Sequence, residues 1–365
     1  MRIFEIGPLA ITESAVLPGV TPKTGFVWIS CSRGELVSRL ADVQQALQST
    51  SGNLLVDLHV SDLLNQQLPS RYDFTSQYDL VIFRRLAAAA SVATSPAVDP
   101  PVRRSGPPAL RRIDTNPVGF AVFDNLLLTV HPDDCPVRDA FAAKLLATAA
   151  EPSQVAAARW PCAPADLMLR IIGQIVDGYL DLRRGLSHQL DHWQAELLSP
   201  KTRFNNWTTL LEARQSLHAL DEVCEDQRTA LQDWIAALQT WPAPQTPAAQ
   251  RERDLLTVRS RDVLEHIERV VRHVRWLERN IETTVQMHFS AQSHRTNEIM
   301  RTLTALTAVF LPLNLITGFF GMNFEFLPLV HREGGLWWAI GIMTAGGFGF
   351  FAVLRRKRYL ARTQR

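Results

Sequence analysis

The sequence predicts an α+β membrane protein with an N-terminal α/β domain, a region of long helices and two transmembrane helices near its C-terminal end. Three observations support this fold class. Segments rich in β-branched and aromatic residues mark residues 1–163, long amphipathic helical patterns begin at Pro164, and two apolar runs without charged residues follow Arg301. Each of these runs is long enough to cross a bilayer, which takes roughly 20 residues of helix.

Residues 1–163 are predicted to form a cytoplasmic α/β domain. Strand-like composition marks FVWISC at 26–31, YDLVIF at 78–83 and VGFAVFDNLLLTVH at 118–131. GELVSRLADVQQAL, at 34–47, has the apolar spacing of a helix. Residues 87–117 are rich in Ala, Pro and Ser and offer little to bury, so we expect a flexible insertion there.

Residues 164–298 are predicted to form the long-helix region and a stalk. Two amphipathic patterns cover 165–198 and 206–241, and the Pro-rich stretch 242–250 separates them from a third. The third pattern starts near Arg251, and a helix from there to residue 323 would be roughly 110 Å long. The bilayer core takes only about 30 Å of that length. We therefore expect most of this helix to stand in the cytoplasm and to pack on its neighbours.

The charge pattern around the two apolar runs predicts their orientation. We assign a first transmembrane helix to 299–323, an external loop to 324–334, a second transmembrane helix to 335–354 and a basic tail to 355–365. The tail reads RRKRYLARTQR, and Arg295 and Arg301 lie before or at the start of the first span. Because basic residues prefer the cytoplasmic side, both termini are expected in the cytoplasm of a cell whose inner membrane holds the protein.

The rest of the composition argues against several functional classes. The chain has 365 residues, a net charge of +2 and four cysteines without a CxxC pair, which indicates reduced thiols in a cytoplasmic domain. Its first residues, MRIFEIGPLAITES, contain no long apolar stretch, so we expect no secretory signal. An enzyme is the least favoured class because no P-loop, GxSxG or HExxH pattern is found. We expect no organic cofactor and no nucleic-acid partner.

One face of the third helix carries polar side chains into the first membrane span. In steps of three and four residues it reads Gln286, Phe289, Ser293, Asn297, Met300, Leu303, Thr307, Leu311, Asn314 and Gly318. A polar residue in a span is costly unless it faces protein or water. The hydroxyls and amides could be structural links between helices, or the whole stripe could line a pore. Two spans cannot enclose a water-filled path, so a pore predicts a symmetric ring of subunits.

The second span shows features of packing rather than of chemistry. Gly341, Ala345 and Gly349 follow one another at four-residue spacing, which favours close helix packing. Trp337 and Trp338 lie at its external end, where an aromatic belt is expected. We place this helix outside the first, facing lipid.

The segment TNEIMRTLTALTAVFLPLNLITGFFGMNF, followed by a second span and RRKR, resembles the CorA family of divalent-cation channels. The resemblance is strong over about residues 255–365 and rests above all on Gly321, Met322 and Asn323. It implies a homopentameric funnel with an α/β/α cytoplasmic domain, a long stalk and two spans per subunit. It also implies that Asn323 lines the external mouth and selects the hydrated ion.

The resemblance assigns further roles along the stripe. Asn297 matches an intracellular polar constriction, and Met300, Leu303 and Leu311 match apolar rings. The chain also departs from the family in three places. Asn314 replaces a common Thr, Gln286 replaces an acidic residue, and LPLV at 327–330 replaces a loop that usually carries an acidic residue. Fewer carboxylates along the pore would weaken its attraction for cations.

The stalk segment SRDVLEHIERV resembles the part of the family that binds a regulatory metal ion between subunits. The resemblance places Asp262 at the acidic position, with Glu265 three residues on and on the same helical face. The alternative is that these carboxylates are solvated or pair with Arg261 or Arg269. If Asp262 and Glu265 bind a metal ion, Mg²⁺ is both the substrate and a regulatory ligand. If they do not, Mg²⁺ is only the substrate.

The resemblance implies passage of Mg²⁺, with Co²⁺ and Ni²⁺ as further cargo, down the electrochemical gradient and across a lipid bilayer. Mg²⁺ dehydrates reluctantly, and amide oxygens can accept hydrogen bonds from its waters without removing them. A first alternative is a Zn²⁺ transporter of the same superfamily, for which His188, His192, His288 and His294 are candidate nitrogen ligands. A second is a membrane-anchored scaffold without a pore.

Overall fold

The computed structural model describes residues 1–8, 10–20, 22, 24–86, 115–150, 160–198, 207–322 and 335–356. The chain divides into two compact units, Met1–Glu282 and Thr283–Arg365. The predicted N-terminal α/β domain and the predicted long helix are both present. The boundary between the units falls inside the stretch 164–298 that the sequence suggested as one stalk region.

A seven-stranded sheet forms the centre of the N-terminal unit, with the strand order β2-β1-β3-β7-β6-β5-β4. Its strands are β1 (Arg2–Ile6), β2 (Ile11–Ser14), β3 (Phe26–Ser32), β4 (Arg71–Phe74), β5 (Asp79–Leu86), β6 (Thr115–Val122) and β7 (Leu126–His131). β3 pairs with β7 in parallel, and the other neighbouring strands of this sheet pair antiparallel. The central strands β3 and β7 are buried along their whole length.

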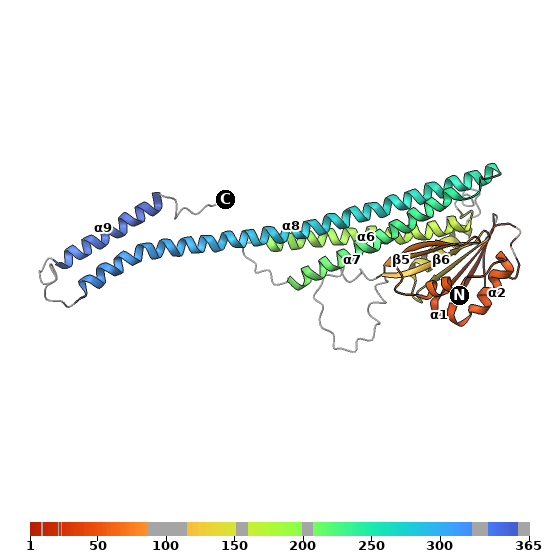
Figure 1. Ribbon diagram of the computed structural model, residues 1–365, viewed down its shortest axis with the longest axis horizontal. Coiled ribbons are helices and arrows are strands. Elements are labelled where there is room, and N and C mark those ends of the chain that lie inside the picture. Colours follow the sequence, from red (N-terminus) through yellow and green to blue (C-terminus); the bar gives the residue numbers. More distant parts are fainter. Residues whose placement is uncertain are drawn as a thin grey trace. The chain divides into compact units, whose positions relative to one another are not determined.

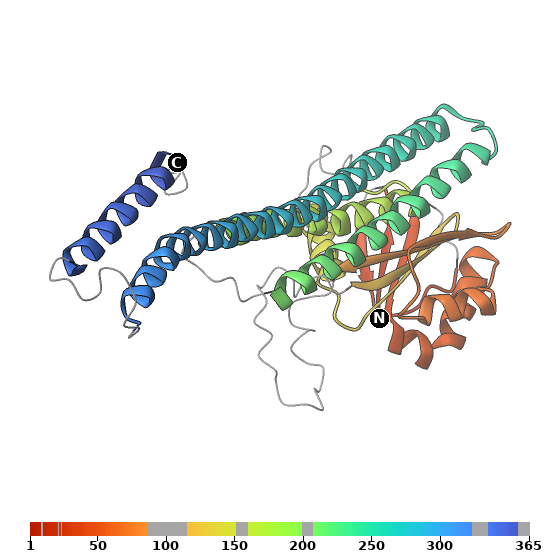
Figure 2. The same cartoon turned by 60° about the vertical axis from the view of Figure 1, so that its left-hand side comes forward.

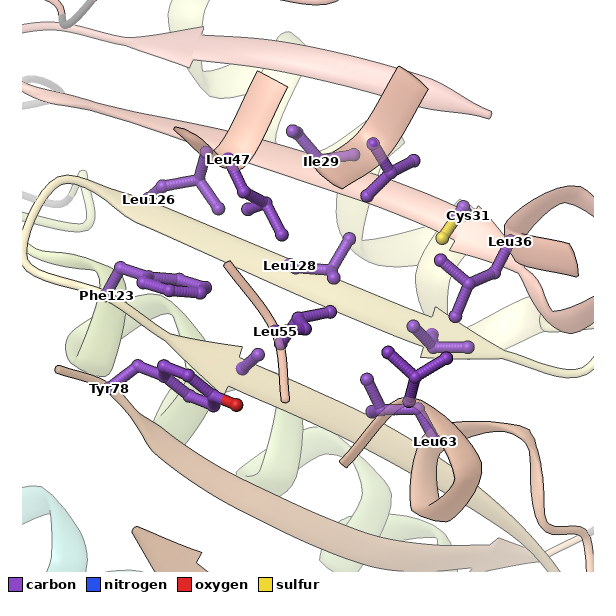
Figure 3. Packing of buried hydrophobic residues seen from close by; sticks show 14 of the residues in the cluster. Ile29, Cys31, Leu36, Leu47, Leu55, Leu63, Tyr78, Phe123, Leu126 and Leu128 are labelled. Atoms are coloured by element: carbon purple, nitrogen blue, oxygen red, sulfur yellow. The ribbon is translucent and has the colours of Figure 1, made fainter. Parts of the chain in front are cut away.

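Helices cover both faces of the sheet (Figures 1 and 2). One face carries α1 (Arg33–Ser38), α2 (Leu40–Ser51) and α3 (Asp57–Leu64). The other carries α4 (Pro136–Ala150), α6 (Pro164–Leu198) and α7 (Trp207–Thr240). Because successive residues of a strand point to opposite faces, β3 contributes side chains to the packing on both faces of the sheet. Figure 3 shows Ile29 and Cys31 packed with Leu36 and Leu47 of α1 and α2.

Trp28, the residue before Ile29 on β3, faces the opposite layer. Its ring stacks on Phe4 with centroids 4.7 Å apart and meets Phe141 of α4 edge-on at 6.1 Å. Its indole N–H donates to Thr129 Oγ1 at 3.0 Å, so the polar end of this buried side chain is satisfied. The central strands are thus buried on both faces of the sheet, as is usual where helices cover both sides.

Two long helices follow α7. Helix α8 runs without interruption from Pro247 to Phe320, through Pro312, and α9 covers Gly335–Arg356. Within the N-terminal unit, α8 packs against α6 and α7. His273 Nε2 lies 2.9 Å from Ser187 Oγ on α6, and the Trp234 indole on α7 donates to Ser260 Oγ at 3.1 Å.

Three local predictions need correction. The stretch 34–47 is not one helix, because Arg39 has φ −124° and ψ 26° and separates α1 from α2. The stretch 118–131 forms two strands joined by a turn, in which Phe123 N donates to Leu126 O at 2.9 Å. The predicted insertion 87–117 ends too late, since residues 115–117 belong to β6 and pair with β5; residues 87–114 lie outside the described part. Strands β1, β2 and β4 were not predicted.

Candidate functional site

Helix α8 loses its packed face near Thr284. Up to that point it presents a row of buried side chains three or four residues apart, consisting of Leu256, Ser260, Val263, Ile267, Val270, Val274, Leu277, Ile281 and Thr284. Among the described side chains of α8 beyond Thr284, only Ala305 is buried. A helix without a packed face in one chain needs lipid, water or other subunits as its surroundings.

The C-terminal part of α8 has the composition of a membrane span. Its most apolar stretch has a mean hydropathy of 1.6 and is 6% buried in the single chain. Among the described residues, this is the one helix whose length and composition suit a membrane crossing. Helix α9 contains a shorter apolar stretch, Ile340–Gly349, so its role as a second span stays a prediction.

All ten residues of the predicted stripe lie on α8 beyond Thr284, and all are exposed in the single chain. At roughly 100° per residue they fall within an arc of about 120° around the helix axis. The bulky apolar members, Phe289, Met300, Leu303 and Leu311, are 57%, 58%, 56% and 69% exposed. The fold therefore gathers these residues on one face of one helix and leaves that face uncovered within the chain.

The polar side chains of the stripe differ in how their hydrogen-bonding groups are satisfied. Thr307 Oγ1 donates to the Leu303 carbonyl at 2.9 Å, so its hydroxyl proton is bound within the helix. The side-chain amides of Asn297 and Asn314 have no hydrogen-bond partner among the residues that the structure describes. Asn314 lies in the apolar part of α8, where an unsatisfied amide is costly. Its partner is therefore water, an ion, another chain or a residue outside the described part of this chain.

Helix α8 ends at the motif that the sequence singled out. Gly321 N donates to the Thr317 carbonyl at 2.9 Å, and Met322 N to the Phe319 carbonyl at 3.4 Å. A Cβ atom on Gly321 would lie 3.0 Å from the Thr317 oxygen, which is closer than side chains normally approach a carbonyl. Gly321 thus lets the chain close the last turn tightly. Asn323, the third residue of the motif, lies outside the described residues.

The candidate regulatory carboxylates lie on α8 within the N-terminal unit. Asp262 and Glu265 have side chains that are 69% and 65% exposed. Glu265 pairs with Arg269 at 3.1 Å, and Asp262 Oδ1 lies 3.8 Å from His266 Nε2. No group of three His, Cys, Asp or Glu side chains in the described part of the chain could hold a metal ion. A metal site at Asp262 would therefore need ligands from elsewhere, such as a neighbouring subunit.

The histidines of the zinc alternative do not gather. His188 and His192 are exposed one turn apart on α6, while His288 and His294 lie on α8 beyond the packed row. The absence of a three-ligand group within the described residues applies to them as well. They stay candidate ligands only in combination with another chain.

Sequence reasoning missed the charged cluster that joins α6 to α8. Asp166, at the start of α6, is fully buried and accepts from Arg170 at 3.1 Å. Its second oxygen lies 2.7 Å from Arg259 Nε on α8. An Asp with an Arg four residues on could have suggested the first pair. The partner from α8 could not be identified, because it comes from a distant part of the chain.

Three comparisons with known proteins place this geometry in context. A family model described as CorA-like Mg²⁺ transporter protein matches residues 25–356. The chain is 23% identical over 194 residues to the cobalt/magnesium transport protein CorA of Thermotoga maritima, which covers 53% of this chain and 52% of that protein. It is 26% identical over 250 residues to the cobalt/magnesium transport protein CorA of Methanocaldococcus jannaschii, covering 68% and 73% respectively.

A solved structure shares the fold over nearly the whole chain. It is the complete structure of the CorA magnesium transporter from Methanocaldococcus jannaschii, with a TM-score of 0.71 and 18% identity. The superposition covers 98% of each chain, so the N-terminal α/β domain and the long helix occur together in both. The aligned sequence spans about half of the Thermotoga maritima relative, at 52%.

Proposed function

The chain belongs to the family of CorA-like Mg²⁺ transporter proteins, and from this premise we propose that it is a channel for hydrated divalent cations. In this proposal Mg²⁺ is the main substrate, and Co²⁺ and Ni²⁺ are further cargo. The pore lies on the axis of a homopentamer, and each subunit contributes the exposed stripe of α8. The protein spans the inner membrane twice per subunit, with both termini in the cytoplasm.

The observation that carries the proposal is a pair of amides on the stripe, Asn297 and Asn314, whose side chains have no hydrogen-bond partner among the described residues. Asn314 lies in the part of α8 whose composition suits a membrane, and Asn297 precedes that part on the same face. A lipid-facing amide in this position would lose its hydrogen bonds to water, whereas a pore restores them. A scaffold without a pore gives no reason for amides at these two positions.

Amides suit a cation that keeps its water shell. Mg²⁺ releases its waters reluctantly, so a pore that conducts it quickly must bind those waters rather than strip them. The carbonyl oxygen of an Asn side chain accepts a hydrogen bond from such a water and carries no full charge. Binding therefore stays weak enough for the ion to leave, which conduction requires. We assign the same role to Asn323 at the external mouth.

The apolar members of the stripe supply a means of closure. Met300, Leu303 and Leu311 are large and exposed, and they lie between Asn297 and Asn314 on the same face as Thr307. Rings of such side chains around a narrow axis expel water, and a dry constriction blocks a hydrated ion. A small widening of the ring would let water return, so the stripe combines ion contact and gating on one helix.

The test is metal uptake by the purified protein in liposomes, with Asn314→Leu as the critical variant. We expect the substitution to lower Mg²⁺ uptake at least tenfold, because it removes the polar contact and narrows the path. Thr302→Val is the matched control, since residue 302 lies on the opposite side of the same helix, roughly 160° from the middle of the stripe. Equal Mg²⁺ uptake by the wild type and by Asn314→Leu would contradict the assignment of the stripe to a pore. In a competition assay, stronger uptake of Zn²⁺ than of Mg²⁺ would favour the zinc alternative.

A further inference from the structure

The N-terminal unit has a large groove whose lining includes neither Asp262 nor any residue of the stripe. Its volume is about 920 Å³. The β4–β5 and β6–β7 turns form one side, and the other is formed by the start of α6, the end of α7 and the first turns of α8. Segments from five places in the sequence thus converge on one concave surface, which is typical of a ligand site.

The charges that line this groove all have the same sign. Five carboxylates contribute to the lining, Asp73, Asp79, Asp124, Asp233 and Glu252, and the described lining residues include no Lys, Arg or His. Asp73 is paired with Arg71 at 2.7 Å. In the described part of the chain, no ion pair is formed by the other four. An acidic groove without its own counter-charge attracts cations from solution.

Two of the unpaired carboxylates are half-buried. Asp79 accepts a hydrogen bond from Tyr72 Oη at 2.5 Å. Burial raises its pKa, and the charge of Asp124 raises it further. Burial likewise raises the pKa of Glu252, with a smaller contribution from Asp166. Both groups would therefore be stabilised in their charged form by a cation placed between them in the groove.

The shape of the lining favours an organic cation over a metal ion. No three of these acidic side chains, or of any others described, come close enough together to hold one metal ion. The carboxylates are instead spread along a groove that also contains aromatic rings, among them Tyr72, Phe123 and Trp241. Aromatic faces attract ammonium groups and cover the methylene segments between them. We propose that this groove binds an extended organic cation with several ammonium groups, of the polyamine class.

The experiment is calorimetric titration of the full-length protein in detergent with spermidine as the probe, at constant ionic strength. We expect saturable binding that weakens about tenfold in Asp79→Asn and in Glu252→Gln, since each variant removes one charged contact. Asp42→Asn is the matched control, because its carboxylate is exposed on α2, 57% in the side chain, and lies outside the groove. Its affinity for spermidine should equal that of the wild type.

The titrations decide whether the groove binds an organic cation. Absence of binding to the wild type, or equal binding in all four proteins, would overturn the proposal. A second titration uses Mg²⁺ in place of spermidine at the same ionic strength. If Mg²⁺ gives the same heats of binding, and Asp79→Asn weakens its binding equally, the groove binds any cation. That result would overturn the assignment to an organic cation. If Asp79→Asn does not fold, Glu252→Gln on the first turns of α8 still tests the groove. The measurement is independent of ion uptake, so it can fail or succeed separately from the proposed channel function.

Discussion

Neutral amides carry the proposed ion contacts, and Asn323 is the one that the family resemblance predicts at the external mouth. We expect Asn323→Ala to abolish Mg²⁺ uptake while the oligomer stays assembled, because the substitution removes an acceptor for the waters of the ion but little of the packing. Uptake into liposomes measures the first effect, and size-exclusion chromatography with light scattering measures the second. Normal uptake by an assembled Asn323→Ala protein would remove Asn323 from the selectivity role.

His131 at the end of β7 predicts a pH dependence of folding. Its side chain is buried, Nδ1 donates to the Pro132 carbonyl at 2.9 Å, and Nε2 lies 2.9 Å from Ser30 Oγ. Burial lowers its pKa from 6.5 to about 4. Between these values the unfolded imidazole binds a proton that the folded one does not, so stability falls as pH drops from 6.5 towards 4.

The effect is measurable by urea unfolding at pH 7 and pH 5. His131 alone should make the free energy of unfolding about 2 kcal/mol lower at pH 5 than at pH 7. His131→Asn keeps a polar side chain but does not titrate, so its loss between the two pH values should be smaller by about that amount. If the free energy of unfolding falls equally in both proteins between pH 7 and pH 5, His131 takes up its proton in the folded protein as readily as in the unfolded one.

The junction of α6 and α8 depends on a buried carboxylate. Asp166 is fully buried, whereas its partners Arg170 and Arg259 are 20% and 32% exposed in their side chains. Asp166→Asn would leave two guanidinium groups without a counter-charge at a partly buried site, which we expect to cost about 2 kcal/mol after allowance for solvent screening. Glu268→Gln, which breaks an exposed pair with Arg272, should cost less than about 0.5 kcal/mol in the same unfolding measurement.

Helix α8 also carries the proposed control of the channel. If a divalent ion joins Asp262 to a neighbouring subunit, the ion favours whichever state it binds more tightly. Asp262→Lys would replace that ion by a fixed positive charge. We expect protease resistance of the cytoplasmic part to depend less on Mg²⁺ in this variant than in the wild type. Asp254→Lys, an exposed position two turns earlier on α8, is the charge-matched control.

If protease resistance depends on Mg²⁺ concentration in Asp262→Lys as it does in the wild type, Asp262 does not bind the regulatory ion. The regulatory metal site then lies elsewhere, or the chain has none. The structure gives a reason for this test, because Glu265 is paired with Arg269 within one chain at 3.1 Å. Asp262 has only a histidine near it, at 3.8 Å. Of the two carboxylates, Asp262 is therefore the one left available for an ion shared between chains.

The assembled protein should be a pentamer with the α8 helices around the axis. The apolar side chains of the stripe, from Phe289 to Leu311, are more than half exposed in the single chain, and a ring of subunits would cover them. Native mass measurement in gentle detergent with Mg²⁺ present is the check. A monodisperse dimer under these conditions would contradict a pore lined by one helix from each subunit.

The sequence alone determined the features that depend on local pattern. The apolar composition of α8 near Asn314 and the three- and four-residue spacing of its polar side chains both follow from neighbouring residues on one helix. The α/β character of the N-terminal region followed in the same way from strands such as β3. The polar stripe was predictable because a helix fixes which of its residues share a face, whatever surrounds it.

Only the tertiary structure decided the features that join distant segments. Short strands such as β4 have little pattern of their own and are held by pairing with β5, so their composition did not reveal them. The contact between Asp166 and Arg259 exists because the sheet and the long helices pack together, and so does the groove that Asp79 and Glu252 both line. Periodicity reports which face of an element a residue occupies. Which other element covers that face is set by the packing of the whole domain.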